Sequence, residues 1–400
     1  MTAPSMNPPT ATTPTPTTNA RPWRLTLVIS SLQAGGAERV LSRMASYWAA
    51  RGHDIEIVTY DRPDARPFYP LHPDVRVRGL DLLRDSRHAL EALWNTAVRV
   101  RRVRRAIVNH RPDAVISFLN HVNVVTLLAT RGLDMPTIVS ERADPAQVPL
   151  ATPWPALRRW TYRHARRVVM QTAEAAAYFD DPRIRTTVIG NAIAPAPALA
   201  RRPMPVRTPA ATATPAAHGN GASPIEHWIT GVGRLDRQKG FDLLLSAFAA
   251  VAAAHPSWGL RIVGDGKERG ALTDQARALG LADRVEFTGR VDNVFPLLAA
   301  ADLFVLSSRF EGFPNVLGEA MAAGLPVIAF DCPSGPRAII RHGIDGLLIP
   351  VEDVAGLAAA IDRLIANPAE REALAARAPE VVERYSEAAI MNRWEELLRS

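Results

Sequence analysis

The sequence predicts an α/β protein built from two doubly wound domains that face each other across a cleft. Three observations support this prediction. The chain has 400 residues, more than a single hydrophobic core usually organises. Short apolar runs, typical of buried parallel strands, alternate with helical patterns through both halves. Between the halves lies a Pro-, Ala- and Thr-rich stretch without periodicity, which we interpret as a linker.

Composition narrows the class of protein. Hydrophobic residues make up 47% of the chain and charged residues 22%, which is ordinary for a globular protein. The single cysteine, Cys332, excludes an internal disulfide and a cysteine-rich metal site, and it fits a reducing compartment. No apolar run approaches the roughly 20 residues that span a bilayer, and the N-terminal segment lacks the apolar core of a secretory signal. We therefore expect a cytoplasmic protein.

Changes in composition also predict the domain boundaries. The ends of the chain and the linker are Pro-rich or strongly amphipathic, whereas the two domains carry the alternating strand and helix patterns. We predict a disordered Pro/Thr-rich tail (residues 1–22), a first domain (23–191), a linker (192–225), a second domain (226–380) and a C-terminal helix (381–400).

The first domain opens with a strand, a glycine turn and a helix. Arg24–Ser30 is apolar, and Gly35 and Gly36 precede an amphipathic pattern over Ala37–Ala50. Such a turn lets a ligand approach the backbone and the free N–H groups of the helix start, although an ordinary strand–helix turn has the same features. Further strands are predicted at Asp54–Tyr60, Val75–Leu80, Asp113–Leu119, Pro136–Ser140, Val168–Thr172 and Thr186–Ile189.

Two predicted helices of the first domain are rich in arginine. They cover Arg84–His110, which carries a tryptophan, and Ala156–Arg167. The first 200 residues hold 26 arginines and 16 acidic residues, whereas the remaining 200 hold 21 basic and 24 acidic residues. Basic amphipathic helices with a tryptophan suit an anionic membrane surface, and a solvated helix face is the alternative. No nucleic-acid-binding motif accompanies the charge, so we expect no nucleic-acid partner.

Polar residues follow two of the predicted strands in this domain. His121 comes just after Asp113–Leu119, and Arg142 comes just after Pro136–Ser140. The carboxyl ends of parallel strands share one edge of a sheet, and open α/β sheets bind ligands at that edge. His121 is therefore a candidate site residue, with a structural histidine at a helix start as the alternative.

The second domain opens with a similar unit. The strand Trp228–Val232 leads into a loop with Arg234 and Lys239, and a helix is predicted over Phe241–Ala254. Two cations in a tight loop at a strand's end can neutralise a diphosphate, whereas solvated loop cations are the alternative. Further strands are predicted at Leu260–Val263 and Val285–Thr288, and further helices at Val354–Ile365 and Arg384–Leu398.

The stretch Ala300–Leu348 carries the strongest signal. A buried strand, Leu303–Leu306, is followed by a polar loop with Glu311, then by a small apolar helix that begins at Val316 with Asn315 as its cap; the strand Pro326–Phe330 comes next. Glu319 is the only charge on that helix. A carboxylate in such apolar surroundings needs hydrogen-bond donors, so we expect it to bind hydroxyl groups rather than to cap a surface helix.

These motifs match a known family. Glu311 and Glu319 are spaced as E-x7-E within FEGFPNVLGEAMAAGLPVIA, and Gly233–Gly240 reads G-R-L-x-x-x-K-G. In this context the chain resembles glycosyltransferase family 4, the retaining nucleotide-sugar transferases of GT-B fold. The resemblance covers Arg24–Ser400 except the linker and is strongest from Gly231 to Leu348. It implies two Rossmann-like domains and a final helix that crosses back to the first domain.

The resemblance also implies roles for the candidate residues. Arg234 and Lys239 would stabilise the departing diphosphate, Glu319 would hold the ribose, Glu311 would hold the transferred sugar, and His121 would orient that sugar. Arg142, in a Ser-Glu-Arg sequence similar to that of some amino-sugar-transferring members, would contact acceptor phosphate. The other residues expected to contact the donor are Gly35, Gly36, Gly264, Arg290, Val291, Asn315, Val316 and Leu317.

The function that follows is retaining transfer of a hexose or N-acetylhexosamine from a UDP-sugar to a lipid-linked or polysaccharide acceptor. No Asp-x-Asp occurs in the chain, so no metal and no other cofactor is expected. A sugar-nucleotide epimerase or a phosphorylase of GT-B fold is the main alternative. The first needs an acid/base set that the chain lacks, and the second needs a pyridoxal-bearing lysine, for which neither Lys239 nor Lys267 suits. A non-catalytic basic membrane-binding protein fits poorly with the acidic second half.

Overall fold

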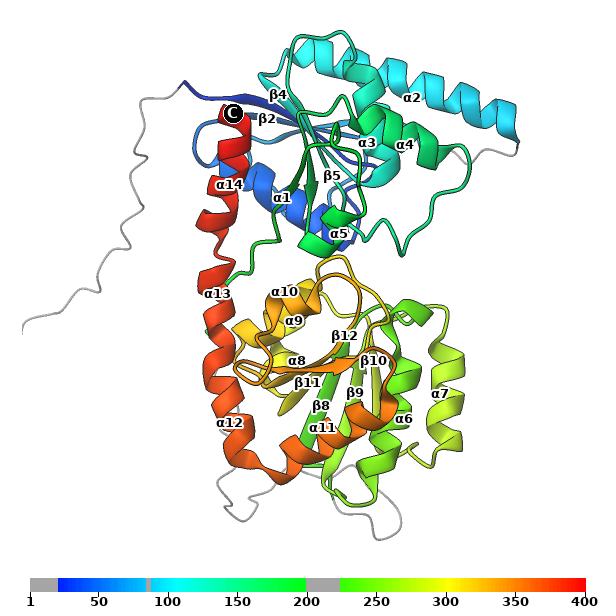
Figure 1. Ribbon diagram of the computed structural model, residues 1–400, viewed down its shortest axis with the longest axis vertical. Helices are drawn as coiled ribbons and strands as arrows, with labels where there is room; N and C mark the ends of the chain where they lie inside the picture. The colour runs from blue at the N-terminus through cyan, green and yellow to red at the C-terminus, as the bar shows by residue number, and fades with distance from the viewer. Residues whose placement is uncertain (1–20, 84–87, 199–223) are drawn as a thin grey trace, which may run out of the picture.

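The structure, a computed structural model, describes residues 21–83, 88–198 and 224–400, and it forms two α/β lobes (Figure 1). Most of the predicted tail and linker, and the start of the predicted helix at Arg84, lie outside the described residues. Each lobe holds one parallel sheet with helices on both faces, so the predicted fold class is confirmed.

The sheet of the first lobe has seven strands within the described residues, in the order β3-β2-β1-β4-β5-β6-β7. The strand order reverses between β1 and β4, which pair in register from Leu25 with Ala114 to Val28 with Ser117. Its strands are β1 (Arg24–Val28), β2 (Asp54–Thr59), β3 (Arg76–Gly79), β4 (Ala114–Phe118), β5 (Thr137–Ser140), β6 (Arg167–Met170) and β7 (Thr186–Val188).

The described part of the second lobe carries a six-stranded sheet in the order β10-β9-β8-β11-β12-β13. The order reverses between β8 and β11. In open α/β sheets this reversal is where loops diverge and leave a crevice for a ligand. The strands are β8 (His227–Val232), β9 (Trp258–Val263), β10 (Val285–Gly289), β11 (Leu303–Leu306), β12 (Val327–Asp331) and β13 (Leu347–Pro350).

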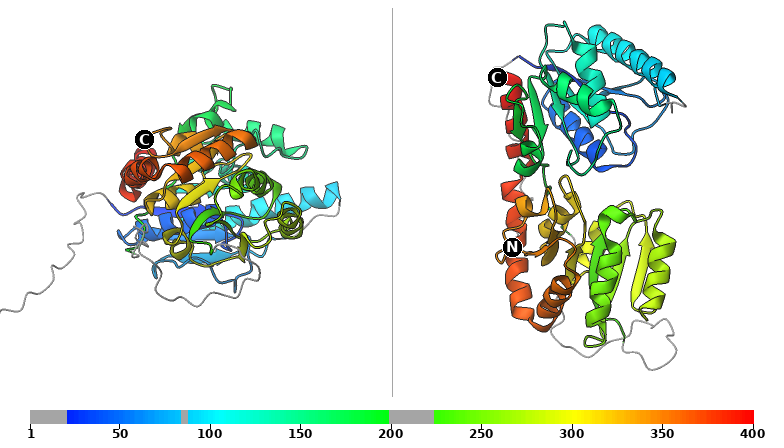
Figure 2. Two further views of the ribbon diagram at one scale, coloured as in Figure 1. Left: turned by 90° about the horizontal axis from the view of Figure 1, so that it is seen from below. Right: turned by 45° about the vertical axis from the view of Figure 1, so that its right-hand side comes forward.

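Helices cover both faces of each sheet, as Figures 1 and 2 show from three directions. In the first lobe they are α1 (Gly36–Ala49), α2 (Ala89–His110), α3 (Asn120–Thr130), α4 (Trp154–Tyr162) and α5 (Ala173–Ala177). In the second lobe and the C-terminal segment they are α6 (Phe241–Ala252), α7 (Arg269–Ala278), α8 (Phe295–Ala299), α9 (Asn315–Ala322), α10 (Pro336–Ile339), α11 (Val354–Ala366), α12 (Pro368–Arg377), α13 (Val381–Arg384) and α14 (Glu387–Arg399), with 3-10 turns η1 (Arg237–Lys239) and η2 (Ala378–Glu380).

Alternation along the strands assigns side chains to the hydrophobic clusters on the two faces of a sheet, as β11 of the second lobe illustrates. On β11, Leu303 and Val305 pack with α6 and α11 residues, whereas Phe304 and Leu306 pack with α9 residues on the other face. This period of two follows from the pleat of a strand. Because both faces are covered by helices, the strand reads as a continuous apolar run.

The C-terminal helices connect the lobes a second time. α12 to α14 form a column along one side of the molecule, and α14 ends beside the first lobe (Figures 1 and 2). Ile390, Met391 and Trp394 of α14 belong to the core that includes Leu25 and Leu27 of β1. The predicted single helix over Arg384–Leu398 is interrupted between α13 and α14, where the Ser386 hydroxyl accepts a hydrogen bond from the Ala389 N–H and caps α14.

One predicted helix is partly wrong. The basic pattern Ala156–Arg167 forms a helix only as far as Tyr162, and Arg167 already pairs in β6 with Ile138 of β5. The run Val168–Met170 is fully buried. The sheet satisfies the backbone of that apolar run, so strand pairing overrides the helical spacing of the arginines before it.

Candidate functional site

The loops that follow the strands at the two reversal points face each other between the lobes. Four segments contribute: the turn before α1 and the residues around Asn191 in the first lobe, and the loops after β8 and β11 in the second. Two side-chain hydrogen bonds join the lobes directly. Asn191 Nδ2 donates to Asn315 Oδ1 at 2.6 Å, and the hydroxyls of Thr172 and Ser334 lie 2.7 Å apart.

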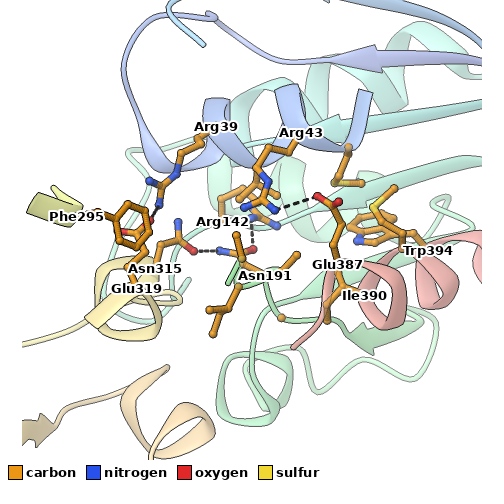
Figure 3. A pocket seen from close by; sticks show the side chains of 17 residues that line it. Arg39, Arg43, Arg142, Asn191, Phe295, Asn315, Glu319, Glu387, Ile390 and Trp394 are labelled. Atoms are coloured by element: carbon orange, nitrogen blue, oxygen red, sulfur yellow. Dashed lines mark hydrogen bonds and ion pairs between the residues drawn. The ribbon is translucent and has the colours of Figure 1, made fainter. Parts of the chain in front are cut away.

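The N-termini of α1 and α9 meet at this junction. A Cβ added to Gly36, the first residue of α1, would lie 3.5 Å from Nδ2 of Asn315, the first residue of α9. Arg39, one turn into α1, forms an ion pair of 2.5 Å with Glu319 of α9 (Figure 3). Each helix start has unpaired N–H groups and the positive end of the helix dipole, so the junction favours an anion.

The helix start at Asn315 differs from the prediction. α9 begins at Asn315 rather than at Val316, and Pro314 precedes it without a side-chain cap. The Asn315 side chain instead accepts a hydrogen bond from Asn191 of the first lobe. Because this partner is distant in the sequence, local capping rules could not predict the position of Asn315 in the helix. Val316 is half-buried, and Leu317 is fully buried in the core on the α9 face of the sheet, so the Leu317 side chain does not reach the surface.

Asn191 is the centre of the junction on the first lobe. Its Oδ1 accepts hydrogen bonds from Arg142 and, at 3.0 Å, from Gln171 Nε2. The Arg142 guanidinium also lies over the Phe118 ring, 4.5 Å from its centroid. Burial lowers the pKa of Arg142, and the nearby Glu38 carboxylate partly opposes that shift. Arg142, predicted to contact acceptor phosphate, is therefore held inside the first lobe by Asn191 and Phe118.

The predicted phosphate loop lies on the other side of the gap. Lys239 is the last residue of the turn η1, and the Asp236 side chain caps that turn. The Lys239 Nζ atom lies 2.6 Å from Glu311 Oε1. The Ser308 hydroxyl donates to the same oxygen at 2.7 Å. Lys239 and Glu311 side chains are 16% and 6% exposed, so this pair is nearly dry. The structure therefore brings these two predicted site residues together.

Arg234 lies nearby but faces solvent. Its side chain is 72% exposed, pairs with Asp236 at 3.2 Å and donates to Gln238 Oε1 at 3.2 Å. Gln238 in turn donates to the Phe310 carbonyl in the loop before Glu311. Arg234 thus shares the loop of Lys239 while its guanidinium stays free to reorient toward a ligand.

Two glycines let these loops approach closely. Gly240 has φ +63°, and a Cβ there would lie 2.0 Å from the Ser307 carbonyl oxygen. Gly264 has φ +139°, and a Cβ there would lie 1.9 Å from the Gly233 carbonyl oxygen. Both positions combine left-handed backbone with a contact that only glycine permits. Gly264 therefore shapes the phosphate loop from behind, through Gly233.

Arg290 and Val291, predicted to contact the donor, lie in the loop after β10. The Arg290 guanidinium lies over the ring of Phe68 of the first lobe, 5.0 Å from its centroid, and Phe68 is 43% exposed. Val291 beside it is half-buried. This contact is a further link between the lobes, formed by an arginine and an aromatic ring that can also stack on a flat ligand.

His121 and Gly35 are placed by local contacts. The His121 ring packs edge-on against Trp154 of α4, with centroids 4.5 Å apart. Desolvation beside Trp154 and the positive charges of Arg99 and Arg158 lower the pKa of His121. No described contact joins His121 to Lys239 or Glu311, so the structure does not bring it into their cluster. Gly35 has an extended backbone and precedes α1.

Two hollows adjoin these residues. A cavity of about 120 Å³ lies between α1, α9 and α14 (Figure 3), with Arg39, Arg142 and Glu319 on one side and Met391 and Trp394 on the other. A more open hollow of about 520 Å³ lies beside the Lys239 loop and is lined by Gln147, Asp236, Arg237, Gln238, Lys267, Arg309, Phe310, Pro333, Val351 and Glu352. Both are bounded by residues of the first and second lobes.

Sequence reasoning missed two residues of this junction. Neither Arg39 nor Asn191 belongs to the motifs that carried the resemblance. Arg39 follows Gly36 by three residues, so helical spacing places both on one face of α1 and could have flagged it. Asn191 follows Gly190 at the end of the first domain, and only the packing of the lobes reveals its role.

Comparison with known proteins agrees with this architecture. Residues 35–192 match the glycosyl transferase 4-like domain, and residues 226–367 match the glycosyl transferases group 1 family. The chain carries these two glycosyltransferase domains and has the GT-B fold. It is 25% identical over 380 residues to the GalNAc-alpha-(1->4)-GalNAc-alpha-(1->3)-diNAcBac-PP-undecaprenol alpha-1,4-N-acetyl-D-galactosaminyltransferase of Campylobacter jejuni, covering 94% of this chain and 98% of that one.

Other similarities are more limited. An exopolysaccharide phosphotransferase of Streptomyces coelicolor is 43% identical over 165 residues, which is 41% of this chain but only 18% of that protein. The solved structure of Anabaena HepE with UDP and glucose has a TM-score of 0.71 and 20% identity, and covers 94% of this chain and 100% of that one. The chain thus spans less than half of the length of several curated relatives that it matches.

Proposed function

We propose that the glycosyltransferase moves a hexose or N-acetylhexosamine from a UDP-sugar to a lipid-linked or polysaccharide glycan, with retention of configuration. Two observations support this proposal: the Lys239–Glu311 pair in the loops after β8 and β11, and the meeting of the first turns of α1 and α9 between the lobes. Together they supply a cation, a carboxylate and two helix N-termini, which match a diphosphate joined to a sugar. The bound UDP of HepE and the undecaprenol acceptor in the name of the Campylobacter relative support the choice of substrates.

The Lys239–Glu311 pair can act on both halves of the donor at once. A lysine ammonium has three N–H donors, so Lys239 can keep Glu311 and still donate to a phosphate oxygen. The second carboxylate oxygen of Glu311 can accept from hydroxyls of the transferred sugar. Arg234, exposed on the same loop, swings toward the diphosphate when the donor enters. Glu319 accepts hydrogen bonds from the ribose, and Arg290 and Val291 border the base.

The reaction then proceeds by departure of the nucleoside diphosphate. The bond between the anomeric carbon and the β-phosphate oxygen breaks, and the acceptor hydroxyl oxygen bonds to the same face of that carbon. The hydroxyl proton passes to the departing phosphate. Negative charge grows on the diphosphate during this step, so Lys239, Arg234 and the helix starts stabilise the transition state more than the ground state. No cofactor takes part in the proposed reaction, and no metal does.

The test is transfer from radiolabelled nucleotide sugars. Purified full-length chain is incubated with UDP-glucose, UDP-galactose, UDP-N-acetylglucosamine, UDP-N-acetylgalactosamine and GDP-mannose, each with and without a polyprenyl-diphosphate-linked glycan. The proposal expects label to enter the acceptor from a UDP-sugar only, with an α-configured product by NMR. Conversion of the donor sugar without acceptor would instead identify an epimerase. Dependence on inorganic phosphate would identify a phosphorylase.

The outer face of α2 is proposed to hold the enzyme at an anionic membrane, at the cytoplasmic side. Leu93 and Trp94 are 63% and 71% exposed there, and Arg101 and Arg105 lie on the same face at helical spacing. An exposed tryptophan next to arginines suits the boundary between lipid headgroups and acyl chains. Among the described residues, no helix has the length and apolar character of a membrane span.

Vesicle sedimentation tests the α2 surface. The chain should co-sediment with phosphatidylglycerol-containing vesicles at low salt, less at high salt, and not with phosphatidylcholine vesicles, because each arginine near an anionic surface adds attraction that salt screens. Trp94→Ala should weaken binding at both salt concentrations. Trp160→Ala, at another exposed tryptophan of the first lobe, is the matched control. Absence of binding at any salt concentration counts against the membrane proposal while leaving the transfer reaction untouched.

A further inference from the structure

The proposed reaction gives no role to Arg39, which forms an ion pair with Glu319 across the two lobes. Arg39 lies on α1 of the first lobe and Glu319 on α9 of the second, with 2.5 Å between Arg39 Nη2 and Glu319 Oε1. Figure 3 shows the two side chains meeting across the gap between the lobes. The Glu319 side chain is 14% exposed and that of Arg39 is 34% exposed. The carboxylate is thus largely withdrawn from water, and Arg39 supplies its charge partner.

We propose that Arg39 lowers the selectivity of the site for nucleotides with ribose hydroxyls, because a ribose must displace its guanidinium from Glu319 before it can bind there. This inference rests on the proposed function, in which Glu319 holds the ribose. In the chain without nucleotide, the Arg39 guanidinium is paired with the Glu319 carboxylate. A ribose must exchange its two hydroxyl donors for that guanidinium, whereas a nucleotide without these hydroxyls leaves the ion pair in place.

The chemistry of the exchange is favourable for a diol and unfavourable for other groups. A carboxylate only accepts hydrogen bonds, and removing a partner from a buried carboxylate costs much more than replacing it. Vicinal hydroxyls can donate to both of its oxygens. A ligand without donors would leave Glu319 desolvated and unpaired if it displaced Arg39, so it binds with the ion pair intact. A ribose instead gives up the ion pair for its own hydrogen bonds, so the pair narrows the difference in affinity between nucleotides with and without ribose hydroxyls.

The exchange also changes the contacts between the lobes. Arg39 leaves Glu319 when the ribose enters, whereas the bonds Asn191–Asn315 and Thr172–Ser334 do not involve either residue. The lobes hence stay joined at the junction while one cross-lobe contact is exchanged for a ligand. A ribonucleotide binds only molecules in which Arg39 has left Glu319. The larger the fraction of molecules with the ion pair formed, the lower the apparent affinity for a ribonucleotide.

The two partners of the ion pair should then have opposite effects on selectivity. The measured quantity is the ratio of the dissociation constants of 2′,3′-dideoxy-UDP and UDP, from isothermal titration calorimetry of the full chain. Arg39→Met should raise this ratio about two- to fivefold, the size expected for a partly exposed ion pair. Glu319→Gln should lower it toward one, and the double variant should behave as Glu319→Gln. Any effect of Arg39 on the diphosphate through its charge alone acts on both nucleotides and cancels in the ratio.

A matched control lies one turn further along α1. Arg43 lines the same cavity and pairs with Glu387 of α14 at 2.9 Å, away from Glu319. Arg43→Met should leave the ratio unchanged. Arg39→Gln, which keeps a polar head, should change the ratio in the same direction as Arg39→Met and serves if the methionine variant does not fold.

The outcomes separate this inference from the proposed function. If the unmodified chain binds neither UDP nor any other nucleoside diphosphate, the proposed function fails and this inference fails with it. If UDP binds but the ratio is unchanged in both Arg39 variants, the selectivity role of Arg39 is overturned and the proposed function stands. A ratio that falls in those variants would make Arg39 a direct donor contact and would also overturn the inference.

Discussion

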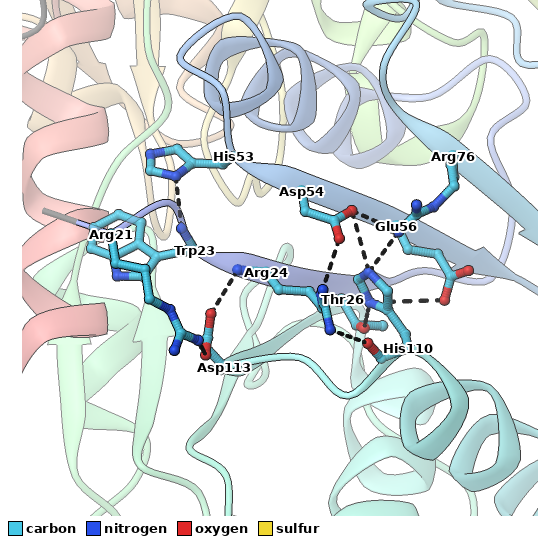
Figure 4. A network of polar contacts seen from close by, with 10 residues as sticks. All are labelled: Arg21, Trp23, Arg24, Thr26, His53, Asp54, Glu56, Arg76, His110 and Asp113. Atoms are coloured by element: carbon cyan, nitrogen blue, oxygen red, sulfur yellow. Dashed lines mark hydrogen bonds and ion pairs between the residues drawn. The ribbon is translucent and has the colours of Figure 1, made fainter.

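Two of the polar clusters in the described part of the first lobe lie at opposite edges of its sheet, and of these two only the one at the carboxyl edge contacts the second lobe. At the amino edge, Arg24, Asp54, Arg76 and His110 form a network around the starts of β1, β2 and β3 (Figure 4). At the carboxyl edge, Asn191 forms hydrogen bonds with Gln171 of its own lobe and with Asn315 of the second lobe.

The amino-edge cluster resembles an active site in its chemistry. His110 is buried; its Nδ1 lies 2.7 Å from the Thr26 hydroxyl, and Arg76 Nη2 lies 2.9 Å from Nε2. Glu56 is equally buried and pairs with Arg78 at 2.7 Å. All these partners belong to one lobe. The comparison shows that buried charged residues alone do not identify a binding site. A binding site also requires that a ligand can reach a charged side chain and replace one of its partners.

The largest expected effect is at Lys239, in the second lobe, opposite the carboxyl edge of the first. Lys239→Met removes the cation next to the departing diphosphate and should lower kcat by about a hundredfold or more, the size found when one stabilising group of a transition state is lost. Stopped assays of UDP release with saturating donor measure it. Arg237→Ala, an exposed arginine of the same turn, is the control and should keep kcat within about twofold. Near-normal turnover of Lys239→Met would remove the phosphate assignment.

The second expected effect is at Asn191, which joins the two lobes. Asn191→Ala leaves Arg142, Gln171 and Asn315 without the oxygen or N–H that they bond. Loss of a buried hydrogen-bonding partner costs about 1–3 kcal/mol, so the free energy of unfolding should fall by about that amount in urea titrations. Asn315→Ala removes only the cross-lobe bond and should cost less than 1 kcal/mol. Equal losses in both variants would mean that Asn191 does not organise the first lobe.

The sequence predicted the parts of the fold that local pattern controls. The apolar run Leu303–Leu306 is β11 to the residue, because a strand covered on both faces shows as an uninterrupted apolar run. Alternation of strands and helices also predicted two doubly wound sheets. The helices that were missed, such as α7 and α12, are rich in polar residues, and packing against the sheet or against α11 rather than their own periodicity selects them.

The site was predictable only where its residues share a loop or motif. Lys239 and Glu311 both come from the strand ends at one reversal point, so parallel-sheet geometry brings them together. Arg39 pairs with Glu319 and Asn191 donates to Asn315, and both partners belong to the other lobe. Nothing in the local sequence encodes the relative placement of two lobes, and so the partners of Glu319 and Asn315 became visible only in the folded chain.

The smallest expected effect completes the comparison, at His110 in the amino-edge cluster. Desolvation lowers the pKa of His110, against the opposing charges of Glu56 and Asp54. A histidine with a folded-state pKa below its usual value of about 6.5 binds a proton more readily when unfolded. Stability should therefore be full above about pH 6.5 and should decline as the pH falls below that value.

His110→Gln should cost about 1 kcal/mol at pH 7.5, because it disrupts buried hydrogen bonds to Thr26 and Arg76, and should flatten this decline. Urea unfolding of both proteins between pH 5 and pH 8 measures the two slopes, and turnover at pH 7.5 should be unchanged. A parallel decline in both proteins would assign the acid sensitivity to other groups. A large loss of turnover in His110→Gln without a loss of stability would mean that the amino-edge cluster affects catalysis. The two clusters would then differ in their distance from the site but not in whether they contribute to function.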